Sequence, residues 1–138
     1  MHPDALIGDI VIGSSIYQHD LDASPLFPKF SVPLLNKTFF DSDDVLSNTI
    51  KQSCLDYLDN DFDTAFKPEQ KQRFFQRQKP QFHVGLIGSG DLFVNALEKQ
   101  NQIAEQMPDT LCVEMEGAAV AQVCYEYDIP FAIFRIIS

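Results

Sequence analysis

The sequence is poor in cysteine and in positive charge, and it contains no long apolar run. Its three cysteines are an odd number and form no C-x-x-C pair. This argues against a disulfide framework or a zinc site and favours a reducing compartment. The apolar runs are far too short to span a bilayer, and residues 1–4 lack the basic start of a signal peptide. We therefore expect a cytoplasmic protein with no membrane partner.

Positive charge is scarce, since 10 Lys and Arg face 20 Asp and Glu for a net charge of -10. Such a field repels phosphate backbones, so nucleic acid is a poor partner and a neutral or cationic substrate is favoured. The acids alternatively serve only to keep the protein in solution. A basic run from Lys67 to Lys79 contains Phe74 and Phe75, a composition that can bind single strands, but the overall charge argues against it.

Motifs for metal or covalent chemistry are missing. His19, Asp20 and Asp22 have no second histidine placed to complete a zinc site, so we expect no metal. The sequence contains no nucleophile elbow, P-loop or H-E-x-x-H. Nothing in it implies a cofactor.

Short apolar runs alternate with helical stretches along the chain. The pattern predicts an α/β fold, with a largely parallel sheet and helices on its faces. Residues 59–80 interrupt this rhythm, and we interpret them as an insertion into a single domain, an excursion or mobile loop with some helix. The last apolar run is typical of a strand buried on both faces of a sheet. Strands are expected at 9–13, 82–88, 110–115 and 130–137, and helices at 41–58, 95–106 and 116–127.

Ligands of open α/β sheets bind beyond the carboxyl ends of the strands. Glu114 and Glu116 flank Met115 at such a place, and their carboxylates suit the hydroxyls of a ribose, which donate hydrogen bonds. Glu116 alternatively complements the dipole of the following helix. Phe93, in the loop after the strand 82–88, is suited to stack on a flat base, but spacing alone favours a core position, because aromatic side chains are usually buried.

Several segments carry a resemblance to the methylthioadenosine/S-adenosylhomocysteine nucleosidases. Residues 112–124 resemble their V-E-M-E-[GA]-x-A-x-A motif, and residues 129–138 resemble V-P-F-x-x-x-R-x-I-S-D. Residues 89–94 resemble S-G-D-x-F-[IV], while 8–12 and 19–22 resemble G-D-[IV]-V-x followed by H-D-x-D. The resemblance implies a three-layer α/β/α sandwich of the nucleoside phosphorylase type with a mixed, largely parallel sheet, incomplete within residues 1–138.

The resemblance also implies roles for individual residues. Phe93 stacks on adenine, and the main chain of Val94 pairs with the edge of the base. Met115 packs under the ribose and Glu116 binds its hydroxyls, with Glu114 beside them in the same pocket. A homodimer is implied as well, in which the loop of Leu26, Phe27 and Pro33 walls the alkylthio pocket of the neighbouring subunit.

The implied reaction is hydrolysis of an N-glycosidic bond with release of adenine, through an oxocarbenium-like state. The family's catalytic acid is the Asp that follows Ser138 in the motif, and its water-orienting Glu and Gly-rich segment precede residue 8. Residues 1–138 contain neither end of this machinery, so we expect a fragment that is inactive as given. Purine nucleoside phosphorylase activity and nucleoside binding without catalysis stay open as alternatives.

Overall fold

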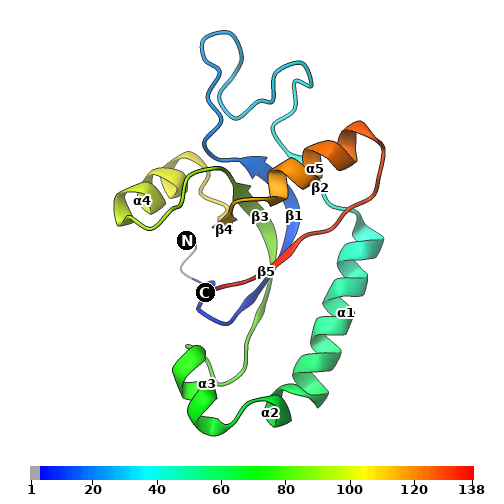
Figure 1. Ribbon diagram of the computed structural model, residues 1–138, viewed down its shortest axis with the longest axis vertical. Coiled ribbons are helices and arrows are strands. Elements are labelled where there is room, and N and C mark those ends of the chain that lie inside the picture. The colour runs from blue at the N-terminus through cyan, green and yellow to red at the C-terminus, as the bar shows by residue number, and fades with distance from the viewer. Residues whose placement is uncertain (1–3) are drawn as a thin grey trace.

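The centre of the molecule is one mixed β-sheet. Within residues 4–138, which the computed structural model describes, it has five strands. Three of them run parallel, in the order β1 (Ile10–Gln18), β3 (Phe82–Ser89) and β4 (Thr110–Glu114). The short strands β2 (Phe40–Asp41) and β5 (Phe134–Ile136) pair antiparallel with β1 (Figure 1).

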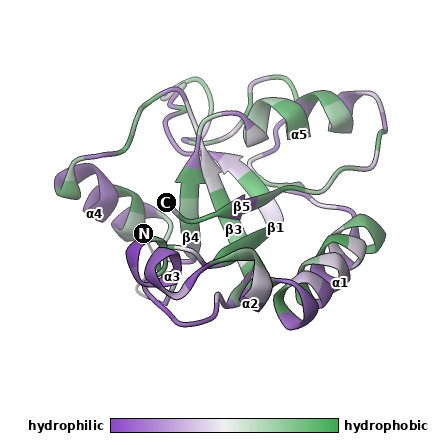
Figure 2. Ribbon diagram, turned by 60° about the horizontal axis from the view of Figure 1, so that its bottom comes forward, coloured by the Kyte–Doolittle hydropathy of each residue, from purple (hydrophilic) through white to green (hydrophobic). Residues whose placement is uncertain are grey.

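Helices cover both faces of this sheet, which confirms the expected three-layer α/β/α arrangement. In Figure 2, α5 (Gly117–Glu126) lies on one side of the sheet, and α1 (Asp44–Asn60) with α2 (Phe62–Ala65) lies on the other. The remaining helices are α3 (Pro68–Phe74) and α4 (Leu97–Gln106). No helix among residues 4–138 is long and apolar enough to cross a membrane.

Alternation along β1 divides the core between the two faces. Val11 and Ile16 are fully buried and belong to the cluster that includes Ala118 and Ala121 of α5. They share a face despite their odd spacing because the pairing of β1 with β3 shifts by one residue at a bulge between Gly13 and Ser15. The opposite face has a second cluster, formed by Ile10, Leu58 and Phe62.

The helix expected to open at 41–44 begins at Asp44, and its preceding residue shows why. The Asp43 carboxylate accepts a hydrogen bond from the Leu46 N–H at 2.8 Å, which is the N-cap interaction that aspartate favours. Phe40 and Asp41 belong instead to β2, which the sequence analysis did not predict. Their pairing with Ser15 and Ile16 extends the sheet by one short strand.

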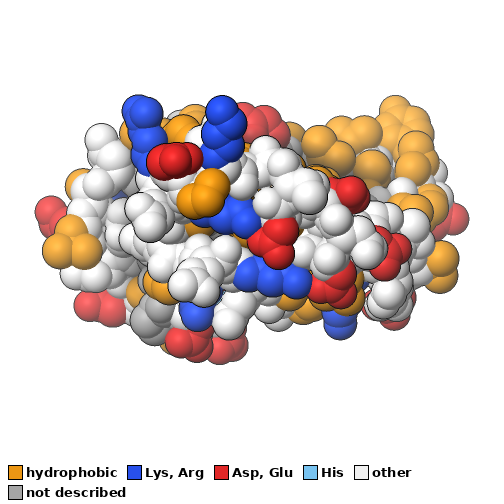
Figure 3. Space-filling model, turned by 90° about the horizontal axis from the view of Figure 1, so that it is seen from below, with side chains coloured by type: hydrophobic (Ala, Val, Ile, Leu, Met, Phe, Trp, Pro, Cys, Tyr) orange, Lys and Arg blue, Asp and Glu red, His pale blue; other side chains and the backbone are white. Residues whose placement is uncertain are grey.

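The excursion of residues 59–80 contains the helices α2 and α3, as the prediction of some helix required. Its aromatic rings pack against one another, with the centroids of the Phe62, Phe66 and Phe75 rings 5.1–5.4 Å apart. Lys71 pairs with Asp63 at 2.5 Å, and Lys79 pairs with Asp59 at 2.7 Å. Basic and acidic side chains therefore alternate on this end of the molecule, as Figure 3 shows.

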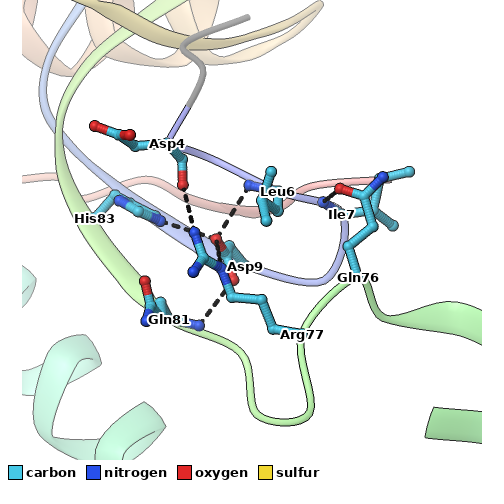
Figure 4. A network of polar contacts seen from close by, with 8 residues as sticks. All are labelled: Asp4, Leu6, Ile7, Asp9, Gln76, Arg77, Gln81 and His83. Atoms are coloured by element: carbon cyan, nitrogen blue, oxygen red, sulfur yellow. Dashed lines mark hydrogen bonds and ion pairs between the residues drawn. The ribbon is translucent and has the colours of Figure 1, made fainter. Parts of the chain in front are cut away.

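A buried carboxylate anchors the excursion to the start of β1 (Figure 4). Asp9 has no solvent exposure, and its Oδ2 lies 3.0 Å from His83 Nε2 and 3.3 Å from Arg77 Nε. It also accepts hydrogen bonds from the N–H groups of Gln81 and Leu6, at 2.8 and 3.1 Å. Burial alone would raise the pKa of Asp9, but these contacts outweigh it and hold the pKa below its usual value.

The prediction for the last apolar run was wrong in extent and in surroundings. Of residues 130–137, only Phe134–Ile136 form a strand, and its outer two residues are 43% and 61% exposed. This strand, β5, pairs antiparallel with Ile10–Ile12. One edge of β1 is fully paired with β3, and β2 pairs with the other edge at Ser15 and Ile16. Only the first residues of that second edge are left to pair with β5.

Candidate functional site

The carboxyl ends of β3 and β4 form one edge of the sheet, and five of the predicted site residues lie at or just after these ends: Phe93, Val94, Glu114, Met115 and Glu116. The two strands are parallel, and Ser89 at the end of β3 lies opposite Glu114 at the end of β4. The loop of residues 90–96 leaves from the first strand, and Met115 and Glu116 lead from the second into α5. The Gly90 N–H donates to the Glu114 carbonyl at 3.1 Å, and this hydrogen bond joins the segments that follow β3 and β4.

Glu114 is the most heavily bonded group at this edge. The Gly117 N–H donates to both of its carboxylate oxygens, at 2.8 and 2.9 Å, and the Glu116 N–H lies 3.2 Å from Oε2. Arg135 pairs directly with Oε2, and the nearby Ser89 hydroxyl also favours the charged form of this carboxylate. Burial would raise the pKa of Glu114, but these donors outweigh it and lower the pKa, so the group is ionised at neutral pH.

Glu116 has the opposite surroundings, although only one residue separates the two acids. Its side chain is 77% exposed, and its carboxylate lies 4.0 Å from the Arg135 guanidinium. Glu116 is the N-cap residue of α5 but makes no side-chain cap hydrogen bond. Met115 between the two acids is 42% exposed. Glu116 and Met115 therefore both offer free surface to a ligand.

The loop after β3 is held close to the end of β1. The Asp91 N–H donates to the Asp20 carboxylate at 2.7 Å, and the His19 N–H donates to the Ser89 carbonyl at 2.9 Å. A side chain at Gly90 would collide with the Asp20 carboxylate, so this approach requires glycine. The H-D segment of the H-D-x-D motif thus fixes the loop that carries Phe93.

Phe93 and Val94 line a hollow of about 230 Å³ between this loop, α4 and the segment after β1. Phe93 is 77% exposed, which excludes the alternative of a core position. His19 also lines the hollow and is 7% exposed. Burial lowers the pKa of His19, so the imidazole is neutral at neutral pH.

The loop predicted to reach a neighbouring subunit stands beyond the carboxyl end of β1, at the top of Figure 1. Leu26 is 85% exposed, whereas Phe27 and Pro33 are half-buried. None of the three lines the hollow beside Phe93, and neither do Glu114, Met115 and Glu116, which lie instead at the end of β4. The structure therefore does not bring this loop together with the other predicted site residues of the same chain.

Arg135 was not among the predicted site residues. The signal that could have indicated it is charge, because Arg135 is the one charged residue in the apolar run 129–137. A lone cation in such a run requires a partner. Its partners are Glu114 and Glu116, where β4 ends and the chain turns into α5.

A family model of the phosphorylase superfamily matches residues 1–138. The chain belongs to the phosphorylase superfamily. The chain is 28% identical over 133 residues to the 5'-methylthioadenosine/S-adenosylhomocysteine nucleosidase of Staphylococcus epidermidis. The match covers 96% of this chain and 49% of that protein. The chain thus spans about half the length of the curated relatives it matches.

Solved nucleosidase structures share the fold of this superfamily chain. The enzyme of Neisseria meningitidis in complex with methylthio-immucillin-A matches with a TM-score of 0.76 and 29% identity, over 100% of this chain and 51% of that one. The enzyme of Colwellia psychrerythraea in complex with adenine matches with a TM-score of 0.76 and 28% identity, over 100% and 49%. The resemblance seen in the motifs therefore extends to the fold.

Proposed function

We propose that this chain carries the nucleoside-binding part of an enzyme that hydrolyses the N-glycosidic bond of 5'-methylthioadenosine and S-adenosylhomocysteine and releases adenine. The observation that carries the proposal is the carboxyl edge of β3 and β4. There an exposed carboxylate, Glu116, stands beside Met115 and Arg135, next to a loop that presents Phe93 and Val94. The names of the matched relatives give the same substrates and reaction class.

Each group has a chemical part in this reaction. The ring of Phe93 stacks on adenine, and the main chain of Val94 binds the edge of the base. Glu116 accepts hydrogen bonds from the ribose hydroxyls. As the bond from C1' to the base breaks, positive charge develops on the ribose, and the nearby negative charge of Glu116 stabilises it. A proton from a carboxylic acid goes to N7 of the departing adenine, and a water molecule adds to C1'.

The test of the binding role is the affinity of the polypeptide for adenine. Stacking on an aromatic ring contributes about 1–3 kcal/mol per base, so Phe93→Ala should weaken adenine binding about tenfold or more. Tyr127→Ala is the matched control, because Tyr127 is an equally exposed aromatic ring (74%) at the end of α5. Calorimetry that finds the same affinity in all three proteins would contradict the assignment of Phe93.

Catalysis requires the acid that the resemblance implies, and residues 1–138 do not contain it. We therefore infer that a polypeptide of residues 1–138 binds the nucleoside without hydrolysing it. Incubation with 5'-methylthioadenosine and chromatography of free adenine tests this inference, and adenine formed above the rate of a heat-denatured control would contradict it.

A purine nucleoside phosphorylase is the second candidate, since the same superfamily name covers phosphorylases. The matched relatives are named as nucleosidases. The hydrolase is therefore favoured. An extended chain that carries the acid decides between them, because ribose 1-phosphate as a product in phosphate buffer would contradict hydrolysis.

A homodimer and a cytoplasmic location are further parts of this proposal. The exposure of Leu26, 85%, fits a residue that contacts a second subunit, and Phe27 and Pro33 lie in the same loop. Sedimentation of the wild-type chain and of Leu26→Asp tests the dimer. A monomer in the wild type would contradict it.

A further inference from the structure

Glu114 is buried and its carboxylate is already occupied by donors of the same chain. Its side chain is only 7% exposed, and its two oxygens accept from the N–H groups of Gly117 and Glu116 and from Arg135. A carboxylate has two oxygens with about four lone-pair sites, so little accepting capacity is left for a ribose hydroxyl. Its position in the motif next to Glu116 therefore does not make it a second ligand-binding acid.

We propose that Glu114 is a positioning residue, which holds Arg135 and the first turn of α5 so that the Glu116 carboxylate stays free for the ribose. This inference rests on the proposed function above, and it replaces the expected role of Glu114 beside the ribose. Glu114 contacts no reacting atom in this account. It acts through the two residues that it fixes.

The placement of the charges explains how this works. Arg135 is paired directly with the buried Glu114 carboxylate, and it is 4.0 Å from the exposed Glu116 carboxylate. The Arg135 side chain is 33% exposed and the Glu114 side chain 7%, so water screens this pair less than the pair with Glu116, whose side chain is 77% exposed. Ionised Glu114 therefore keeps Arg135 from closing onto Glu116. Without the charge of Glu114, the guanidinium turns to Glu116 and competes with the ribose hydroxyls.

The main-chain contacts act in the same direction. The N–H groups of Glu116 and Gly117 are at the start of α5, where helix donors have no partner within the helix. Because both donate to Glu114, the main chain of Glu116 is fixed relative to the end of β4. Glutamine at position 114 keeps one oxygen for these donors but loses the charge that holds Arg135.

The first experiment measures Arg135 without a ligand. Phenylglyoxal modifies free guanidinium groups, and peptide mass spectrometry follows each arginine of the 138-residue chain separately. In Glu114→Gln we expect modification of Arg135 to become severalfold faster relative to Arg73, which serves as the internal standard. Glu116→Gln should leave the rate nearly unchanged. An unchanged Arg135 rate in Glu114→Gln would overturn the proposal.

The second experiment compares two ligands that differ by the ribose. A hydrogen-bonded ion pair contributes enough that Glu114→Gln should weaken 5'-methylthioadenosine binding about tenfold, while adenine binding changes less than about twofold. Glu105→Gln, on the exposed surface of α4, is the charge-matched control and should change neither. Glu114→Gln added to Glu116→Gln should weaken 5'-methylthioadenosine binding no further, because Glu114 acts through Glu116.

The outcomes separate this inference from the proposed function. Equal loss of both ligands in Glu114→Gln, together with a lower thermal midpoint, would show a general structural role and overturn the positioning role. Wild-type binding of both ligands with no effect of Glu114→Gln would overturn the positioning role and leave the proposed function intact. A folded wild-type chain that binds neither ligand would contradict the proposed function, and the Arg135 modification rates would still decide whether Glu114 holds Arg135.

Discussion

Replacing Asp9 by asparagine should destabilise the chain more than any exposed charge change. Asp9 is fully buried and has four partners, the side chains of Arg77 and His83 and the N–H groups of Gln81 and Leu6. Asparagine has the same shape but no charge. Its amide NH2 group replaces one carboxylate oxygen, so a donor then faces groups that are themselves donors. The variant therefore leaves the Nε–H of Arg77 or one or more main-chain N–H groups without their acceptor, while the guanidinium keeps its bond to the Asp4 carbonyl (Figure 4).

The expected magnitude follows from the exposure of the partners. Breaking a buried ion pair by removing one partner costs about 3–5 kcal/mol. Arg77 and His83 are 29% and 16% exposed, so water recovers part of this energy. We expect Asp9→Asn to lower the free energy of unfolding by about 2–4 kcal/mol, a large share of the roughly 5–15 kcal/mol of a typical domain.

Urea denaturation followed by circular dichroism measures this loss. With a slope of about 1–3 kcal/mol per molar urea, the midpoint should fall by about 1–3 M. The matched control is Asp59→Asn, since the pair of Asp59 with Lys79 has side chains 67% and 49% exposed. Such a surface pair contributes about 0–1 kcal/mol. Equal midpoints for the two variants would refute the argument that the Asp9 network stabilises the fold.

The same network predicts the dependence of stability on pH. The pKa of Asp9 is held below its usual value in the folded chain. Its contribution is therefore fully present above the unfolded value of about 4 and is lost as the pH falls through the lower folded value. Thermal melts between pH 3 and pH 7 should show a steep loss at the acid end in the wild type, and a flatter one in Asp9→Asn.

Three other positions give sharp expectations. Alanine at Gly8, where φ is +95° and a Cβ would collide with the Phe75 ring, should cost about 1–3 kcal/mol in urea denaturation. Burial raises the pKa of the Cys112 thiol to about 12, so iodoacetamide at pH 8 should label the half-buried Cys124 well before Cys112, as read by peptide mass spectrometry. The lowered pKa of Glu114 means that Glu114→Gln should also flatten the acid loss of stability, and an unchanged melt profile would contradict the bonding found at that residue.

The elements that the sequence predicted well are those whose signals are local. β3 and β4 are short apolar runs bounded by glycine, proline or polar residues, and α4 and α5 follow them with helical composition. The elements that it predicted poorly depend on partners far away in the chain. β1 continues past the polar Ser14 and Ser15 to Gln18 because β3 pairs with it along this length. β2 is a strand only because its two residues, Phe40 and Asp41, pair with the free edge of β1 at Ser15 and Ile16.

The candidate site shows the same division. The S-G-D-x-F and E-M-E segments indicated which residues lie at the carboxyl edge, since each follows a recognisable strand. The partner of Glu114 could not be predicted, because Arg135 lies 21 residues further on, in a run whose composition suggested a central strand. The edge of β1 left free by β2 decides where that run passes, and no local pattern encodes this edge.

The contrast between Glu114 and Glu116 comes from the place where a strand becomes a helix. In a continuing strand, residues two apart point to the same side, and both carboxylates would share one environment. Here β4 ends at Glu114 and α5 begins at Gly117, so the chain turns between the two acids. The free N–H groups at the start of the new helix donate to the carboxylate of Glu114, which is held inside, while Glu116 on the turn is left facing solvent. The two glutamates therefore have different roles, and the turn between them, rather than the residue type, decides which carboxylate is accessible to a ligand.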